Sequence, residues 1–369
     1  MELAIGYFLL SILGIIKRRS KLLTYLMLTV MWIVFGFCTY NGDFGNYSWI
    51  YHNVQNPAYW TEFEPLYTAF MYVCSLFGMN FVQFRMVFGA AFILLLNYTI
   101  GQYTENKAEV LGLYMLFPYL YFTSVVRSGF AGILVALAYH RLFSGKGKKG
   151  RYWILMGIAV LFHYTSIFFI VYYFFRAKKI KRITLIIIFV LLISVFVLYY
   201  SGIMYNLLSR ITSSERILNW YKTGGSSAQK PRWVLYLIVI DAMVVFLAYL
   251  SKWDSRAIAQ NSFHSNPYAT EIYSLSIAML IFIPTFLLSN NSARLMWQML
   301  LLVIISYAKD DECRYEHNSL LSFHLNKNLI LIALLMFFFY YSNLPYRGTI
   351  NDGFMVFQNN LIYTTYSGW

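Results

Sequence analysis

The stretch "FVQFRMVFGAAFILLLNYTIG" (residues 81–101) is apolar over almost its whole length and carries one charged side chain, Arg85. Similar runs recur from one end of the 369-residue chain to the other. They cover residues 3–16, 22–40, 65–79, 81–101, 108–122, 125–143, 152–175, 183–201, 233–250, 272–288, 295–307 and 328–342. A helix needs about 20 residues to cross the core of a bilayer, and these runs lack the strict alternation of a strand. The sequence therefore predicts an all-α polytopic membrane protein, a multi-pass helical bundle that forms one domain over residues 1–369.

The composition agrees with a membrane protein and argues against a soluble enzyme. Hydrophobic residues make up 59% of the chain and charged residues 12%, whereas soluble domains are about 25% charged. The net charge of +14 needs no nucleic-acid partner, because cytoplasmic Lys and Arg set the orientation of a multi-pass protein. Three scattered cysteines, and no metal-binding, phosphate-loop or nucleophile-elbow motif, predict no metal and no cofactor.

Basic clusters predict which ends of the runs face the cytoplasm. The run 152–175 lies between "GKGKKGR" (145–151) and "RAKKIKR" (176–182). A single crossing would leave one of these clusters outside, against the positive-inside rule. We therefore expect a re-entrant hairpin of two half-length helices with its apex near "FHYTS" (162–166).

The segment 65–79 is also short for a span. We expect this segment, rather than 108–122, to turn back within the membrane. The resulting topology has about ten spanning helices of about 20 residues each. Its external loops are 41–64, 202–231 and 343–369.

Two polar features inside this pattern have structural interpretations. The stretch 308–327 contains Cys313 and two histidines that superficially resemble metal ligands, but its charge predicts a solvated cytoplasmic loop. Asp241 lies in the middle of the run 233–250, where an acid is costly. We expect Asp241 to hydrogen-bond a Tyr or Ser of the bundle.

The basic residues predicted to face outward are mostly arginines. The set consists of Arg85, Arg127, Arg210, Arg216, Lys222, Lys230, Arg232, Arg294 and Arg347. The fork of an Arg binds two phosphate oxygens at once, so the set indicates a phosphorylated ligand. For each single Arg, the alternative is a side chain that reaches the membrane interface without any ligand.

Two of these arginines lie in motifs that favour a binding role. In "SVVRSGFAGILVALAY" (124–139), small residues follow Arg127 and let neighbouring helices approach, so we expect a functional charge held inside the bundle. The alternative is a structural pair with an acid such as Glu64. In "LLSNNSARLMW" (287–297), Arg294 comes at the start of a predicted helix, after a short polar break. We expect Arg294 to be a second cation that binds an anionic group; the alternative is an interfacial Arg in a tight turn.

The motif "LFHYTSIFF" (161–169) places His163 at the predicted apex of the hairpin. A neutral His is a good proton acceptor near pH 7, and the alternative is a hydrogen-bonded structural residue. The external loop 202–231 predicts an amphipathic interfacial helix that carries Arg210, followed by a flexible segment that could act as a lid.

The segment 41–70, "NGDFGNYSWIYHNVQNPAYWTEFEPLYTAF", places acids among Tyr and Trp residues. Its acids are Asp43, Glu62 and Glu64. Asp43, Tyr47 and Tyr51 recur every four residues, so a short helix would align them on one face. The two glutamates come directly before a short apolar segment, and we expect them close to the outward arginines. The segment therefore predicts one wall of an outward-facing site.

Five motifs, taken in order, resemble the EpsG group of Wzy-type bacterial polysaccharide polymerases. They are "NGDFGNYSWIY" (41–51), "EFEPLY" (62–67), "VVRSGFA" (125–131), "LFHYTS" (161–166) and "NSARL" (291–295). The resemblance extends over most of the chain, from the first motif to the last. One departure is Ser128, because the group often has Gln directly after the corresponding Arg.

The resemblance implies a GT-C-like membrane glycosyltransferase in the bacterial cytoplasmic membrane, with external catalytic loops. Its implied reaction is the polymerisation of undecaprenyl-pyrophosphate-linked oligosaccharide repeat units into exopolysaccharide or capsule. The transfer would be inverting and would take place on the outer face of the membrane, without a metal or a nucleotide-sugar donor. The implied partners are the lipid-linked oligosaccharide as donor and acceptor, membrane lipids, and a chain-length regulator and flippase of the same pathway.

The departing pyrophosphate needs fixed cations, and the acceptor hydroxyl needs a base. The expected site residues are His163, Glu64 and Asp43 for catalysis, Arg127, Arg294, Arg210 and Arg85 for the pyrophosphate, and Tyr47, Tyr51, Glu62 and Tyr67 for sugars. His163 is the expected base, with Glu64 or Asp43 as the next choice.

Other function classes remain open at this point. One is a flippase for the same lipid-linked oligosaccharide or another transporter, and a second is a glycan ligase of the related class. Transporters often have internal repeats and a cation-lined central cavity. The two halves of the chain share no convincing repeat, and the candidate residues gather on the outer side, which favours the polymerase.

Overall fold

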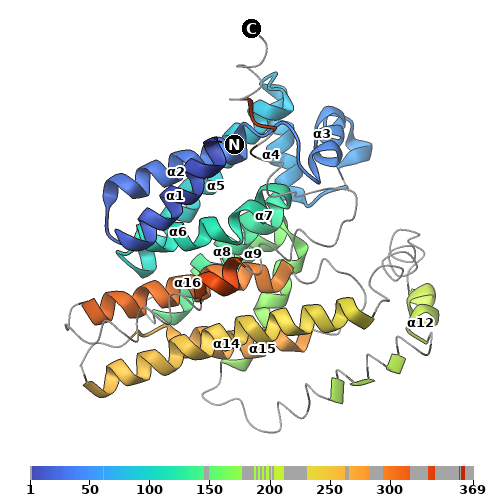
Figure 1. Ribbon diagram of the computed structural model, residues 1–369. Helices are drawn as coiled ribbons and strands as arrows, with labels where there is room; N and C mark the ends of the chain where they lie inside the picture. The colour runs from blue at the N-terminus through green and yellow to red at the C-terminus, as the bar shows by residue number, and fades with distance from the viewer. Residues whose placement is uncertain are drawn as a thin grey trace.

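The computed structural model describes residues 2–60, 62–144, 149–176, 203–211, 231–261, 266–282, 294–315 and 331–336, and single residues within 187–201 and 357–361. Its helices (Figure 1) are α1 Glu2–Ile16, α2 Lys21–Gly36, α3 Phe44–Asn53, η1 Pro57–Tyr59, α4 Pro65–Leu76, α5 Phe81–Tyr103, α6 Lys107–Leu116, α7 Tyr119–Ser124, α8 Val126–Phe143, α9 Lys149–Phe162, η2 Tyr164–Ile170, α10 Val171–Phe175, α12 Ile203–Ile211, α14 Pro231–Asn261, α15 Ala269–Met279 and α16 Arg294–Tyr315. Within these residues the β pairing is an isolated bridge between Cys38 and Asn360. The expected all-α class is confirmed.

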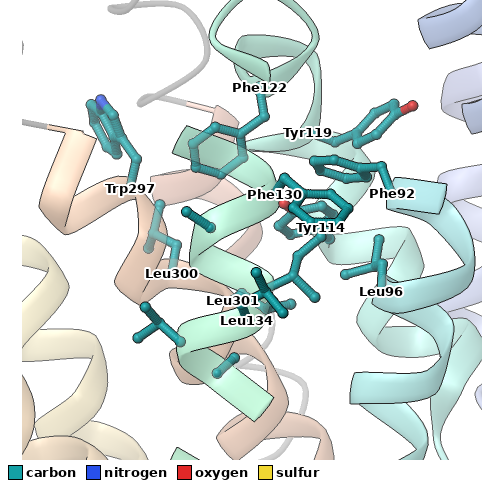
Figure 2. Packing of buried hydrophobic residues seen from close by; sticks show 14 of the residues in the cluster. Phe92, Leu96, Tyr114, Tyr119, Phe122, Phe130, Leu134, Trp297, Leu300 and Leu301 are labelled. Atoms are coloured by element: carbon teal, nitrogen blue, oxygen red, sulfur yellow. The ribbon is translucent and has the colours of Figure 1, made fainter. Parts of the chain in front are cut away.

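Helix α8 is buried along almost its whole length and packs against α5, α9 and α16. Figure 2 shows Phe92 of α5 and Leu300 of α16 on opposite sides of α8, which carries Phe130. Small residues allow this packing, because a Cβ added at Gly132 would lie 2.9 Å from Cγ of Gln298. The close helix approach that the sequence predicts for this motif is confirmed.

Helices α1 and α6 also approach closely, through small residues and side-chain bonds to the backbone. The Ser11 hydroxyl donates to the carbonyl of Gly112 at 2.7 Å, and the Tyr7 hydroxyl donates to the carbonyl of Met115 at 2.7 Å. A Cβ added at Gly112 would lie 2.5 Å from the carbonyl oxygen of Ser11. The two helix backbones therefore have room for glycine here and for no larger residue.

Large apolar side chains lie on the outside of the bundle as well as in its core. On α1, Ile5, Leu9 and Ile16 share one helix face and are 54%, 55% and 64% exposed. An exposed apolar face of this kind is typical of a helix in contact with lipid. In the part of the chain that the structure describes, α5 is the one helix long and apolar enough to cross a membrane, while α1, α2 and α4 are shorter apolar helices. The multi-pass arrangement stays a prediction.

The run 152–175 is interrupted where the sequence predicts its apex. Helix α9 ends at Phe162, His163 has extended backbone (φ −158°, ψ 113°), and the 3-10 helix η2 follows. Helix α4 has 12 residues, so the segment 65–79 is indeed short. The re-entrant placement of both segments in a membrane stays a prediction.

The run 108–122 is interrupted as well, which the sequence analysis did not anticipate. Helix α6 ends at Leu116, and α7 starts at Tyr119, beyond Pro118. Proline lacks the N–H that continues a helix and disfavours helical backbone at the residue before it. A single uninterrupted helix over this run is therefore wrong.

The expected solvated loop at 308–327 is wrong for its first part, because α16 continues to Tyr315. Asp310 is fully buried and accepts hydrogen bonds from the Ser251 hydroxyl and the Asn266 amide. Its neighbour Asp311 is buried and lies 3.5 Å from Arg18. These acids belong to a polar network that joins the α1–α2 connection, α14 and α16. Their partners, which are distant in the sequence, offset the free-energy cost of burying the carboxylates. The two histidines of this stretch lie outside the described residues.

The expected hydrogen bond of Asp241 to a Tyr or Ser is also wrong. Asp241 is buried on α14, and neither of its carboxylate oxygens has a hydrogen-bond partner within the described structure. Its neighbours along α14, Ile240 and Val244, are fully buried apolar residues that offer no side-chain donor.

The two ends of the described chain meet beside the connection from α2 to α3 (Figure 1). The backbone N–H of Thr39 donates to the carbonyl of Asn359 at 2.7 Å, and that of Leu361 donates to the carbonyl of Phe37 at 2.9 Å. Phe357 packs its ring against Tyr7 of α1. The C-terminal residues thus hold the segment that leads into α3.

Candidate active site

Glu64 comes directly before α4 and has extended backbone (φ −66°, ψ 147°), followed by Pro65 at the first helical position. A proline favours extended backbone at the residue before it and tolerates the first turn of a helix. The "EP" pair therefore starts α4 directly after Glu64. The carboxylate is buried and contacts residues of α8 and of the α9–η2 break.

Arg127, the second residue of α8, forms an ion pair with Glu64 through Nη1. Its Nε donates a hydrogen bond of 3.0 Å to the hydroxyl of Tyr47 on α3. Its guanidinium lies 4.0 Å from the ring centroid of Phe63 and 5.9 Å from that of Tyr67. An acid, a hydroxyl and aromatic faces thus fix the position of the cation.

His163, at the break between α9 and η2, lies on the other side of Glu64. Its Nδ1 is 2.7 Å from Oε1 of Glu64, and the backbone N–H of Tyr164 donates to the same oxygen at 3.3 Å. An ionised carboxylate only accepts hydrogen bonds, so Nδ1 of His163 carries the proton. In the neutral imidazole, Nε2 is therefore the basic nitrogen.

Glu64 is ionised at neutral pH. Burial by itself raises the pKa of its carboxyl, but the hydrogen bond from His163 and the charge of Arg127 outweigh burial and lower the pKa to about 2. A carboxylate with so low a pKa is a poor proton acceptor at neutral pH. In this arrangement the Glu64 carboxylate contacts both Arg127 and His163 and fixes the orientation of both side chains.

Arg127 keeps donors for a ligand although it is paired. A guanidinium has five N–H donors, and the contacts to Glu64 and Tyr47 use Nη1 and Nε. In the described part of the chain, no hydrogen bond from Nη2 is observed, and the side chain is 16% exposed. The site therefore presents a held cation beside an oriented imidazole.

Comparison with known proteins gives one match. The model of the EpsG family matches residues 21–359, which is nearly the whole chain. The chain belongs to the EpsG family. No curated protein matches it, and no solved structure does. Membership of this family points to polysaccharide biosynthesis and to a polymerase type of function.

Arg85 of this EpsG-family chain forms no hydrogen bond or ion pair with Glu64, Arg127 or His163 in the described structure. It is buried, and its Nη2 donates to the carbonyls of Phe35 at 2.9 Å and Thr123 at 3.4 Å. These carbonyls lie at the C-terminal ends of α2 and α7, where the helix itself provides no partner. The expected pyrophosphate role of Arg85 stays a prediction, and its contacts are those of a residue that joins two helix ends.

The two tyrosines expected on one face of α3, Tyr47 and Tyr51, make contacts in two different places. Tyr47 reaches Arg127, whereas Tyr51 is buried and donates from its hydroxyl to the carbonyl of Met79 at 2.8 Å. Asp43 precedes α3, is half-buried, and makes no side-chain capping hydrogen bond. Glu62 is half-buried as well. Of the three acids in this segment, Glu64 is the one that contacts Arg127 and His163.

Of the two remaining expected arginines, the structure describes the side chain of Arg210 but not that of Arg294. Arg210 is exposed on α12, so a helix is present where the sequence predicts one. Arg294 is the first residue of α16, as expected, but its side chain lies outside the described residues, and so does the predicted lid within 212–230. No group of three or more His, Cys, Asp or Glu side chains in the described residues is arranged to hold a metal ion.

Gln298 is a residue of this region that the sequence analysis missed. Its Nε2 donates to the carbonyl of Ser128 at 3.0 Å and to the hydroxyl of Ser128 at 2.8 Å. It joins α16 to the start of α8, next to the site arginine. The signal available in the sequence is a lone amide in the apolar run "LMWQMLLL" (295–302), where a polar residue needs a partner.

Proposed function

We propose that the protein is a polysaccharide polymerase that joins undecaprenyl-pyrophosphate-linked oligosaccharide repeat units on the outer face of the bacterial cytoplasmic membrane. The observation that carries this proposal is the contact of one buried carboxylate, Glu64, with both Arg127 and His163. Glycosyl transfer from a lipid pyrophosphate needs a cation for the leaving group and a base for the acceptor hydroxyl. Membership of the EpsG family supports the same type of reaction.

In the proposed reaction, a terminal hydroxyl of the incoming repeat unit attacks the anomeric carbon of the growing chain. His163 accepts the hydroxyl proton at Nε2 while the new carbon–oxygen bond forms. The bond from the anomeric carbon to the pyrophosphate breaks, and the pyrophosphate leaves with the electron pair. A single displacement of this kind inverts the anomeric configuration.

Arg127 is proposed to stabilise the departing pyrophosphate through Nη2. Its Nη1 and Nε are held by Glu64 and Tyr47, and Phe63 lies over the guanidinium plane, so the cation is in place before the substrate arrives. A cation fixed in advance stabilises developing charge without reorganisation. Arg294 is proposed as the second cation, because a pyrophosphate offers two phosphate groups.

The aromatic residues closest to the cation are proposed to position it rather than to bind a sugar. Tyr47 and Tyr67 are buried with their rings near the guanidinium of Arg127. The half-buried Asp43 and Glu62 are the proposed sugar-facing groups of the same wall. Carboxylates are suitable acceptors for sugar hydroxyls.

The apolar outer surface supports the proposed place of the protein in a membrane. Exposed Ile, Leu and Val side chains on α1 and α5 would be costly in water and are favourable in lipid. A lipid-linked substrate with a long polyprenyl tail requires such a position. The proposed protein is thus one multi-pass domain that meets donor and acceptor at its outer side, without a resident metal or cofactor.

The test is a detergent assay, free of vesicles, with purified full-length protein and lipid-linked repeat units. A ladder of polymer lengths is the expected result. No product in detergent, together with movement of the lipid-linked substrate across liposomes, would instead indicate a flippase. Transfer of the glycan to a different acceptor, without elongation, would indicate a ligase.

Variants of α8 provide a matched control for this assay. Arg127→Ala is expected to abolish the ladder while the protein still inserts into the membrane. Arg141→Ala removes an Arg from the opposite end of the same helix, where it contacts Tyr98 and Gln102, and is expected to leave the ladder intact. A normal ladder from Arg127→Ala would contradict the proposed role of this residue.

A further inference from the structure

Gln298 of α16 holds the first turn of α8 by two hydrogen bonds. Its amide nitrogen is 3.0 Å from the carbonyl oxygen and 2.8 Å from the hydroxyl oxygen of Ser128. Both residues are buried, at 3% and 1% exposure. Gly132, one turn further along α8, makes room for the side chain, because a Cβ there would lie 2.9 Å from Cγ of Gln298.

The orientation of this amide is determined by its partner. The carbonyl of Ser128 can only accept a hydrogen bond, so the amide nitrogen of Gln298 has to face it. The amide oxygen then points away from Ser128, and it is buried without a partner in the described residues. Gln298 therefore acts as a donor toward α8, a role that neither Leu nor Glu can take.

The same contact sets the register of two helices that carry the site arginines. Arg127 directly precedes Ser128, and Arg294 lies four residues, or one helical turn, before Gln298. The two helices run in the same direction, because their far ends meet one region of the chain: Tyr103 donates to the carbonyl of Ala136, and Asn106 donates to the carbonyl of Ala308. The arginine-bearing ends of α8 and α16 therefore lie at the same end of the bundle.

We propose that Gln298 is a positioning residue that fixes the start of α8, and with it Arg127, against α16 for pyrophosphate binding. Figure 2 shows apolar side chains of α16, such as Leu300 and Leu301, among the buried residues around α8. Apolar contacts alone permit small sliding, whereas the paired hydrogen bonds of Gln298 specify one register.

This inference rests on the proposed function, since it takes Arg127 and Arg294 to bind the pyrophosphate. The ligand to test is inorganic pyrophosphate alone, with binding measured by calorimetry on purified full-length protein. Gln298→Leu is expected to weaken pyrophosphate binding about tenfold, because binding then has to restore the position of α8, at a cost equal to about one hydrogen bond. Ser128→Ala, which removes one of two acceptors, is expected to have a smaller effect in the same direction.

Two comparisons separate positioning from a general loss of stability. Gln102→Leu is the same substitution at the opposite end of the bundle, where the residue accepts from Arg141, and it is expected to leave pyrophosphate binding unchanged. In an Arg127→Ala background, Gln298→Leu is expected to add no further loss, because the cation that Gln298 positions is already absent. A purely structural role would lower the melting temperature and give additive losses.

The outcomes distinguish this inference from the proposed function. If the wild-type protein makes polymer and Gln298→Leu binds pyrophosphate as tightly as the wild type, the positioning role is overturned and the polymerase function stands. If the wild-type protein makes no polymer and Gln298→Leu still weakens pyrophosphate binding, the positioning role is supported and the polymerase function is overturned. A wild-type protein that binds no pyrophosphate would overturn the positioning role in any case.

Discussion

Glu64 and His163 are 99 residues apart in the chain, yet the Glu64 carboxylate accepts a hydrogen bond of 2.7 Å from the His163 imidazole. The second oxygen of the same carboxylate holds Arg127. One acid thus orients an imidazole and a cation together.

Loss of the carboxylate is expected to destabilise the protein. Glu64→Ala leaves the mostly buried Arg127 without its counter-charge, and breaking such a pair costs about 3–5 kcal/mol. The measurement is the free energy of unfolding in detergent. Glu62→Ala, which changes a half-buried glutamate two residues away, is the matched control and is expected to cost under about 1 kcal/mol.

A double variant sharpens this prediction. Glu64→Ala combined with Arg127→Ala removes both charges, so it is expected to be more stable than Glu64→Ala alone. If the losses of the two single variants simply add, the ion pair does not account for the effect of Glu64.

The stability that Glu64 provides is expected to depend on pH in the acid range. The pKa of Glu64 is lowered from 4.5 to about 2 in the folded protein, so the unfolded chain binds this proton first as the pH falls. The contribution is complete above about pH 4.5 and declines as the pH falls toward 2. The stability difference between the wild type and Glu64→Gln is expected to be constant near neutral pH and to narrow below 4.5. A difference that stays constant down to the acid limit would contradict the lowered pKa.

His163→Asn is expected to separate catalysis from structure. The Asn amide N–H can replace the Nδ1–H that His163 donates to Glu64, but it provides no nitrogen that accepts a proton at the Nε2 position. Polymer formation is expected to fall about 10²–10⁴-fold, the usual effect of losing a general base, with little change in melting temperature. The exposed His52→Asn is the control. Full activity of His163→Asn would exclude His163 as the base.

Arg85 is expected to matter for stability and not for pyrophosphate binding. Arg85→Met removes the hydrogen bonds to the carbonyls of Phe35 and Thr123, which cap the ends of α2 and α7. The carbonyl of Thr123 keeps the hydrogen bond from Asn41, so the expected cost is about 1–3 kcal/mol for the carbonyl of Phe35, which loses its donor. Calorimetry with pyrophosphate on the folded fraction of this variant is expected to match the wild type. Weaker pyrophosphate binding by Arg85→Met would indicate that Arg85 contributes to the phosphate site.

Gly112 is expected to tolerate no side chain. Gly112→Ala would place a Cβ 2.5 Å from the backbone carbonyl of Ser11, so α1 has to move away from α6. The expected loss of stability is about 1–3 kcal/mol. Gly157→Ala, on α9 with nothing within 4 Å of the added Cβ, is the matched control and is expected to be neutral or stabilising, because Ala favours a helix. Equal melting temperatures for the two variants would contradict the close packing of α1 on α6.

The sequence predicts the helices and the break at His163 because both depend on local signals. Apolar runs of helical length specify helices, and basic clusters on both sides of 152–175 indicate an interruption. The interruption at Pro118 also has a local cause, and the sequence analysis missed it because the run around it is continuously apolar. The buried acids of α16 lacked any local signal, since their partners Arg18, Ser251 and Asn266 are far away in the chain.

The sequence by itself determined the all-α class, the membership of the EpsG family and a short set of acids, arginines and one histidine that could form a site. Only the tertiary structure decided that Glu64, and neither Asp43 nor Glu62, contacts both Arg127 and His163. It also separated Arg85 from this cluster and brought Gln298 to the start of α8. The physical reason is that hydrogen bonds and ion pairs act over about 3–4 Å, and long-range helix packing determines which distant side chains come that close.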